Sequence, residues 1–184
     1  MLEFNFTPFP NLETQRLKLR RLKITDVNEI LALRSNPEIM KYIPRPLITT
    51  KEEALEFIVR MDANIDNNTL INWAITTKEE DRLIGMIGYY RTKHEDFRSE
   101  VGYILSGEYH GKGIITEALQ RVVQFGFEEM GLHSIEAVID PDNFASEKVL
   151  LKTNFIKEGH FKDHVFFEGK FLDSVFYSLL NKNH

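Results

Sequence analysis

Hydrophobic and polar residues in the first third of the chain follow periods that predict one strand and two helices. Leu17 and Leu19 alternate with basic residues, which is typical of a strand with one buried face. Helix-start signals stand at Thr25 and Thr50, and apolar residues follow each of them at helical spacing. The prolines within 40–48 predict an irregular segment between the two helices.

The middle of the chain predicts three strands and a long amphipathic helix. Apolar runs indicate strands over 70–77, 83–92 and 100–105, and the first two are joined as a hairpin. A helical pattern then continues to about Met130, with an apolar stripe on one face and Glu117 among the residues expected to face water.

The last third predicts a buried strand over 133–139, a helix over 144–153 and an aromatic-rich hairpin over 155–180. Most strands are therefore connected as hairpins, and helices stand between some of them. This order predicts an α/β fold with a mixed, largely antiparallel central sheet flanked by helices. We expect a single domain over 1–184.

Composition narrows the functional classes. The 184 residues are 42% hydrophobic and carry a formal net charge of -5, which argues against a general nucleic-acid binder. The chain has no cysteine, so disulfides, thiolate metal sites and a cysteine nucleophile are excluded, and no metal site is expected. No apolar run approaches the ~20 residues of a membrane span, and the start does not resemble a signal peptide. We expect a cytoplasmic protein without a membrane partner.

A glycine-rich loop over 107–113 joins the strand 100–105 to the long helix. A strand, a glycine loop and a helix N-terminus form an anion-binding arrangement, because the first N–H groups of the helix have no partner within it. A Walker A loop is excluded because Gly113 follows Lys112 where Ser or Thr is required. A dinucleotide fingerprint is excluded because Thr116 stands where a third small residue is required.

Four segments, in the right order, resemble one known family. The loop with the helix start at 108–119 resembles the acyl-CoA pyrophosphate loop of the GNAT N-acetyltransferase superfamily. The segments 12–20, 100–105 and 142–155 resemble the opening strand, the strand before the loop and the later helix of its RimJ/RimL-type branch, the ribosomal-protein-alanine N-acetyltransferases. The resemblance spans nearly the whole chain and implies a GNAT-like version of the mixed sheet.

The resemblance implies acetyl-CoA as co-substrate and an amine as acceptor. It assigns main-chain contacts with the donor to the end of the strand and to the loop, and a contact with CoA to Asn143, although capping of the helix alone explains that residue better. The implied donor-binding residues are Ile104, Leu105, His110, Gly111, Lys112, Gly113, Ile114, Ile115 and Asn143. Glu108 departs from the Gln or Arg that many members carry, so the main chain is expected to hold the pyrophosphate.

Two residues are candidates for the chemistry. Glu100 is the candidate base that takes a proton from the amine, and it could instead be a solvated charge at the start of a strand. Ser146 matches the position suggested for protonating the departing thiolate, and it could instead form local hydrogen bonds in the first turn of a helix. For Tyr103 we expect core packing rather than a place in the cleft.

The acceptor is predicted more loosely than the donor. An α-amine has an ordinary pKa of ~8 against ~10.4 for lysine, so more of it is neutral near pH 7. We therefore expect a protein or peptide N-terminus, and a ribosomal protein is one candidate. Polyamines, amino-acid derivatives and antibiotics are alternatives, and so is a catalytically silent acyl-CoA-binding module. The aromatic C-terminal hairpin could support a homodimer.

Overall fold

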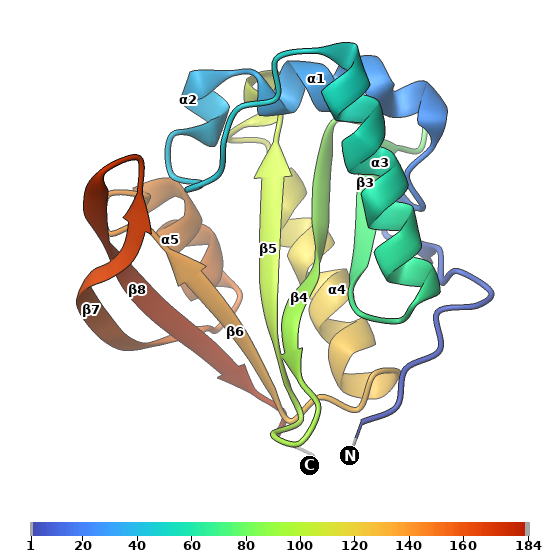
Figure 1. The fold of residues 1–184 in the computed structure, drawn as a ribbon. Helices are drawn as coiled ribbons and strands as arrows, with labels where there is room; N and C mark the ends of the chain where they lie inside the picture. Colours follow the sequence, from blue (N-terminus) through green and yellow to red (C-terminus); the bar gives the residue numbers. More distant parts are fainter. Residues whose placement is uncertain (1, 183–184) are drawn as a thin grey trace.

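The computed structural model describes residues 2–182. The strands are β1 (Leu12–Glu13), β2 (Leu17–Arg20), β3 (Ile71–Thr77), β4 (Gly85–Lys93), β5 (Arg98–Leu105), β6 (Ser134–Ile139), β7 (Ile156–Phe167) and β8 (Lys170–Leu180). The helices are α1 (Val27–Arg34), α2 (Pro37–Met40), α3 (Lys51–Asp66), α4 (Ile114–Glu128) and α5 (Phe144–Lys152), with 3-10 turns η1 (Ile24–Asp26) and η2 (Gly107–Tyr109). Figure 1 shows their arrangement.

The strands form one eight-stranded sheet in the order β1-β2-β3-β4-β5-β6-β8-β7. Only β5 and β6 are parallel neighbours, and α4 lies in the connection between them. All other neighbours are antiparallel. The predicted mixed, largely antiparallel sheet flanked by helices is confirmed.

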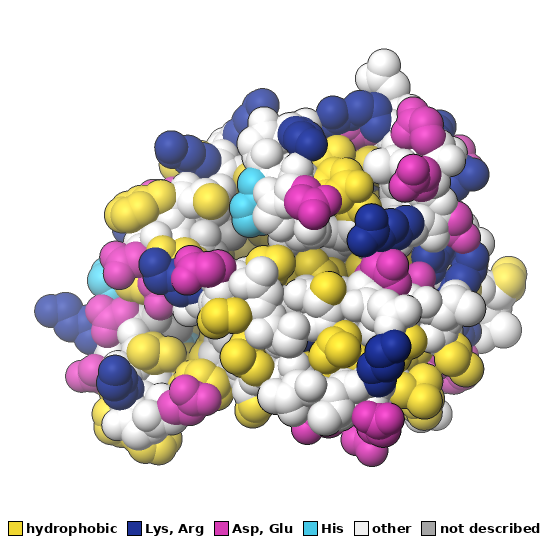
Figure 2. Space-filling view, turned by 90° about the horizontal axis from the view of Figure 1, so that it is seen from above, with side chains coloured by type: hydrophobic (Ala, Val, Ile, Leu, Met, Phe, Trp, Pro, Cys, Tyr) yellow, Lys and Arg dark blue, Asp and Glu magenta, His cyan; other side chains and the backbone are white. Residues whose placement is uncertain are grey.

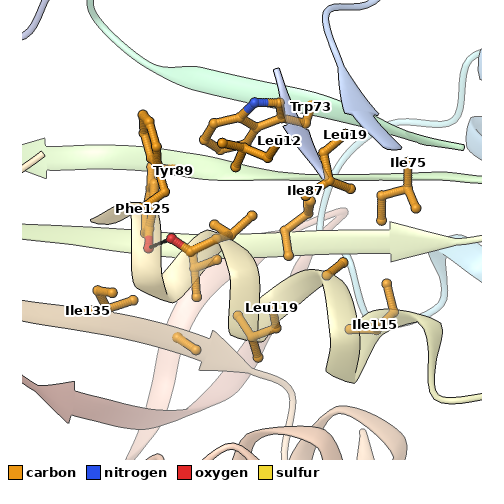
Figure 3. Close-up of a cluster of buried hydrophobic side chains, with 14 of the residues drawn as sticks. Leu12, Leu19, Trp73, Ile75, Ile87, Tyr89, Ile115, Leu119, Phe125 and Ile135 are labelled. Carbon is orange, nitrogen blue, oxygen red and sulfur yellow. Dashed lines mark hydrogen bonds between the residues drawn. The ribbon is translucent and has the colours of Figure 1, made fainter. Parts of the chain in front are cut away.

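Helices cover both faces of the sheet. Successive side chains of the central strands point to opposite faces and so contribute to a core on each side. Trp73, Ile75 and Ile87 point into a core that packs against α4, where Figure 3 shows them with Leu119. Ala74 and the equivalent residues of neighbouring strands point into a second core beneath α1 and α3. Strands buried on both faces have nearly continuous apolar sequences, and this explains the long apolar runs from which these strands were predicted.

The sheet opens between β5 and β6. Their pairing runs only from Arg98 to Glu100 on β5, opposite Ser134 to Glu136 on β6. β6 pairs with β8 along its whole length and follows the C-terminal hairpin away from β5. Figure 1 shows the two strands together at one end and apart toward the end covered by α1 and α2. The separation leaves one edge of β5 without a strand partner.

Helices α2 and α3 begin with side-chain caps. The Oδ1 of Asn36 accepts the N–H of Glu38 at 2.9 Å and caps the short helix α2, which was not predicted from the sequence. The predicted helix start at Thr50 is confirmed as a capping box of α3. In α3 the side chain of Phe57 is buried in the core, whereas Val59 is 55% exposed.

The face of the molecule seen from above (Figure 2) carries no single dominant charge. Figure 2 shows the molecule from above, with basic, acidic and apolar side chains mixed over that face. Within residues 2–182, no helix combines the length and apolarity needed to cross a bilayer. In the same residues, no group of three or more His, Cys, Asp or Glu side chains is arranged to hold a metal ion.

Candidate active site

A cleft of about 790 Å³ runs through the sheet where β5 and β6 separate. Four residues predicted from the sequence line it: Glu100, Ile104, Asn143 and Ser146. The other predicted residues lie outside the lining, at the end of β5, in the loop after it and in the first turn of α4: Leu105, His110, Gly111, Lys112, Gly113, Ile114 and Ile115. The structure therefore places both catalytic candidates, Glu100 and Ser146, in one cleft. The glycine-rich loop directly follows β5, the strand that carries Glu100.

The register of β5 decides which main-chain groups reach the cleft. The N–H of Ser106 donates to the Ile84 carbonyl at 2.8 Å. Hydrogen-bonded pairs repeat every two residues in an antiparallel ladder, so Ile104 directs its N–H and C=O toward β4. Tyr103 and Leu105 direct theirs toward the opening. The expectation for Ile104 is thereby corrected: its main chain is used within the sheet, and Tyr103 takes the position facing the cleft.

The loop after β5 has the backbone of an anion-binding turn. Gly111 and Gly113 have φ of +73° and +75°, and a Cβ added to Gly111 would meet no atom within 4 Å. Gly113 is the N-cap residue of α4. Across residues 2–182, no acceptor is found for the main-chain N–H groups of 111–116. These groups and the helix dipole favour a bound phosphate.

His110 has a different part in the loop from the one expected. Its main-chain N–H donates to the Gly107 carbonyl at 3.1 Å, so this group is not free for a ligand. Its Nε2 lies 3.1 Å from the carbonyl oxygen of Leu105. His110 therefore ties the loop to the end of β5, and in the described chain the main-chain N–H groups without an acceptor begin at Gly111.

Glu117 holds the first turn of α4 against the segment before β2. Its Oε1 accepts from the Thr14 hydroxyl at 2.6 Å, and its Oε2 accepts from Arg16 Nε at 2.6 Å. Arg16 Nη1 also donates to the Lys112 carbonyl at 3.0 Å. Burial raises the pKa of Glu117, but the hydrogen bonds from Thr14 and Arg16 outweigh it and lower the pKa below its ordinary value. The expectation that Glu117 faces water is wrong, because its side chain is only 18% exposed.

Glu100 lies opposite Tyr90 of β4, on the sheet face covered by α1 and α3. Its Oε2 accepts from Arg91 Nη1 at 2.5 Å, while no partner for Oε1 is found within residues 2–182. The register of β4 shifts between Tyr90 and Lys93, and Arg91 has a φ of 47° in this bulge. One carboxylate oxygen is therefore held and the other remains open to a ligand.

Ser146 and Tyr103 approach each other on the α5 side of the cleft. Asn143 Oδ1 accepts the Ser146 N–H at 3.1 Å, which confirms Asn143 as the cap of α5. The Ser146 hydroxyl makes no hydrogen bond to the helix main chain among the described residues. The Tyr103 hydroxyl is near it without reaching hydrogen-bond geometry, and burial raises the pKa of Tyr103 to about 12 while Ser146 opposes that rise. The Ser146 hydroxyl is therefore available to a ligand, and the Tyr103 hydroxyl lies buried next to it.

Three cleft residues were not singled out from the sequence. Tyr103 was expected in the core, and it lines the cleft because β5 lacks a neighbour at this point. Arg34 and Tyr90 were not considered as site residues. A signal did exist for Arg34, since this cation continues the apolar helical spacing of α1 onto the face that turns toward the sheet. Nothing in the sequence pattern distinguished Tyr90 from a core residue.

Comparisons with known proteins agree with this geometry. A family model described as the acetyltransferase (GNAT) domain matches residues 16–156. The chain is 34% identical over 172 residues to the uncharacterized N-acetyltransferase YoaA of Bacillus subtilis strain 168, covering 94% of this chain and 97% of YoaA. It is 24% identical over 163 residues to the spermidine N(1)-acetyltransferase of Escherichia coli K12, covering 86% and 83% of the two chains.

A solved structure extends the comparison to the fold. The ribosomal-protein-S5-alanine acetyltransferase of Vibrio fischeri superposes with a TM-score of 0.83 at 26% identity, covering 95% of this chain and 98% of that chain. The family match spans most of the sequence, including the loop, Glu100 and Ser146. The chain therefore belongs to the GNAT acetyltransferase family and is an N-acetyltransferase that uses acetyl-CoA as acetyl donor.

Proposed function

We propose that this enzyme acetylates the α-amine at the N-terminus of a protein or peptide, bound in the cleft between β5 and β6. The observation that carries this proposal is the position of two candidate groups on opposite sides of one opening. Glu100 lies on the face covered by α1 and α3, and Ser146 lies on the side of α5. An acceptor and a donor can therefore approach each other through the sheet.

The residues present fit acetyl-CoA. The main-chain N–H groups from Gly111 to Thr116 are free to hold the pyrophosphate. Tyr103 offers an unpaired main-chain edge and a buried hydroxyl without a hydrogen-bond partner among the described residues. Bound acetyl-CoA supplies the thioester carbonyl that the amine attacks. Main-chain N–H groups of this β5 edge would stabilise the negative charge that develops on the carbonyl oxygen.

Proton transfer at the two ends of the reaction is assigned to side chains of the cleft. Glu100 Oε1 accepts the proton of the amine, directly or through one water, while Arg91 holds Oε2 in place. The Ser146 hydroxyl donates a proton to the departing thiolate. Tyr103 packs beside the Ser146 hydroxyl and limits the positions that this hydroxyl can take, without a hydrogen bond to it.

An α-amine suits this arrangement better than a lysine. With an ordinary pKa of ~8 the α-amine is already partly neutral near pH 7, so Glu100 needs to remove a proton from a smaller fraction of the acceptor. The similarity to the Vibrio fischeri enzyme supports a protein N-terminus, and a ribosomal protein remains one candidate. A small-molecule amine is the second candidate, because about 790 Å³ is a volume typical of small-molecule sites and one relative acts on spermidine.

A panel of acceptors tests the proposal. Acetyl-CoA is mixed with the enzyme and with peptides, polyamines or amino acids, and released thiol is followed. Peptides with a free α-amine should be acetylated near pH 7, and Nα-blocked peptides with a free lysine should require a higher pH. Equal rates for both peptides at pH 7 would contradict the α-amine assignment. Binding of CoA without release for any amine would support a silent acyl-CoA-binding module.

A second copy of the chain is the proposed partner of the C-terminal hairpin. β7 is an outer strand of the sheet, and the side chains of Phe166 on β7 and of Phe171 on the neighbouring β8 are each 64% exposed. Exposed aromatic side chains on an edge strand favour association. Sedimentation of the wild type should give a dimer that Phe166→Ser weakens. A monomer at all protein concentrations would contradict this part of the proposal.

A further inference from the structure

Three arginines at one end of the cleft have no carboxylate partner. Arg34 from α1, Arg60 from α3 and Arg45 from the segment between them all line the opening. Within residues 2–182, no Asp or Glu lies within 4.0 Å of their guanidinium groups. Every other arginine described has such a partner: Arg16, Arg20, Arg21, Arg82, Arg91, Arg98 and Arg121. The lack of a partner is confined to the cleft.

Arg34 is held in place by packing rather than by ion pairs. Its Cζ lies 4.6 Å from the centre of the Phe57 ring, and Arg60 Cζ lies 5.8 Å from the same ring. The Arg34 Nε is buried and has no hydrogen-bond partner in the described chain. Burial lowers the pKa of Arg34, the charges of Arg60 and Arg45 lower it further, and Tyr90 opposes the change. A bound anion would relieve this cost.

Arg34 and the proposed base line the same cleft, and Tyr90 lies between them in the chain of contacts. Tyr90 stands opposite Glu100 in the ladder between β4 and β5. Burial raises the pKa of Tyr90 to about 12; its hydrogen bond with Asn72 and the charge of Arg34 act against this, and the charge of Glu100 adds to it. The Tyr90 hydroxyl is therefore within electrostatic reach of both Arg34 and Glu100. A ligand in this part of the cleft would be exposed to both the Glu100 carboxylate and the Arg34 guanidinium.

The charges in the cleft are divided between its walls. The carboxylates of Asp140, Glu168 and Asp173 line the wall made by β6 and the C-terminal hairpin. Asp173 is engaged by His160 Nε2 at 2.7 Å. The unpaired cations come only from the opposite wall of α1, α3 and the segment between them. An acceptor with several positive charges would be repelled at that wall.

We propose that the acceptor carries a carboxylate near its reactive amine, and that Arg34, supported by Arg60 and Arg45, binds this carboxylate. A guanidinium binds a carboxylate through two parallel hydrogen bonds, which fixes orientation as well as position. The pair would hold the acceptor so that its amine lies at Glu100. The inference rests on the proposed acetyl transfer and narrows it, because it disfavours polyamines.

Matched acceptors test the proposal in the wild-type enzyme. Thiol release from acetyl-CoA is compared for an amino acid and its carboxamide, and for a dipeptide with Asp or Asn at the second position. The acid of at least one pair should have a kcat/KM about 10- to 100-fold above its uncharged partner. The first pair reports on a free amino acid and the second on an acidic peptide. Equal values within both pairs, or a faster reaction with a diamine, would overturn the inference.

The substitution Arg34→Met separates recognition from catalysis. It should lower kcat/KM for the preferred carboxylated acceptor by about 10- to 100-fold and leave its uncharged partner and CoA affinity unchanged. Arg82→Met is the matched control, because Arg82 is 64% exposed, pairs with Glu29 and lies outside the cleft. An equal loss for both acceptors would contradict the assignment. If Arg34→Met does not fold, the wild-type comparison alone decides. No thiol release with any amine would instead count against the proposed function.

Discussion

Among single residues, Ser146 has a main-chain N–H with a structural role and a hydroxyl with a proposed chemical role. Asn143 accepts the main-chain N–H of Ser146, so the cap of α5 does not depend on the hydroxyl. Ser146→Ala should therefore leave the melting temperature nearly unchanged and lower kcat by about 100-fold, the lower end of what a positioned acid contributes. Thiol-release kinetics and a thermal melt check both parts. Unchanged kcat would remove Ser146 from the chemistry.

Tyr103 gives a second prediction at this scale. Its hydroxyl is buried without a hydrogen bond in the described chain, so Tyr103→Phe removes a polar group that the fold does not satisfy. The variant should be as stable as the wild type or slightly more stable. If Tyr103 positions Ser146, kcat should fall while CoA affinity stays constant, and combining the change with Ser146→Ala should add little. Fully additive losses would show that the two hydroxyls act independently.

Glu117 gives a prediction about pH. Its pKa is lowered on folding, so its stabilising effect is fully present above the unfolded value of about 4.3 and is lost as the pH falls through the lower folded value. Glu117→Gln should lower the free energy of unfolding by about 1 kcal/mol at pH 7, a small value because Arg16 is half exposed. It should also flatten the loss of stability in acid.

Urea unfolding between pH 3 and 7 measures both effects of Glu117→Gln. Glu128→Gln is the control, because Glu128 is an exposed residue of the same helix. If the two variants had the same pH dependence, the anchoring role of Glu117 would be wrong.

At the scale of elements, the loop before α4 depends on backbone conformation rather than on side chains. Gly111→Ala puts a Cβ on a residue with φ of +73°, which costs about 1–2 kcal/mol, and should weaken CoA binding about 5- to 30-fold. Gly107→Ala is the control, since a Cβ there meets no atom within 4 Å and no left-handed φ is involved. Calorimetric titration measures both. A larger effect from Glu108→Gln than from Gly111→Ala would contradict the account.

The sequence predicted elements best where local chemistry decides them. The helix start predicted at Thr50 was confirmed, with the Thr50 side chain accepting the N–H of Glu53. Predictions failed where a partner far along the chain decides. Glu117 is polar and sits in an amphipathic helix, yet Thr14 and Arg16 cover it. Only the folded chain brings those residues together.

At the scale of the whole molecule, the fold class followed from the order of elements, but the opening in the sheet did not. The parallel pairing of β5 and β6 stops after Glu100, and no residue pattern in either strand predicts where it stops. The cleft follows from that opening, and with it the meeting of Arg34, Tyr90 and Glu100 from three different elements. Ser146 was found through family resemblance and Glu100 through its place on the strand before the loop, whereas Arg34 needed the structure.

The central claim is that one cleft joins acetyl-CoA to an α-amine and transfers the acetyl group directly. The most direct test mixes enzyme, acetyl-CoA and an active acceptor, and counts released thiol against acetylated acceptor by mass spectrometry. The amounts of released thiol and acetylated acceptor should be equal, with the acetyl group on the α-amine. Both products should decrease in parallel in Glu100→Gln and Ser146→Ala. Thiol release without an acetylated amine, or acetylation confined to lysine side chains, would contradict it.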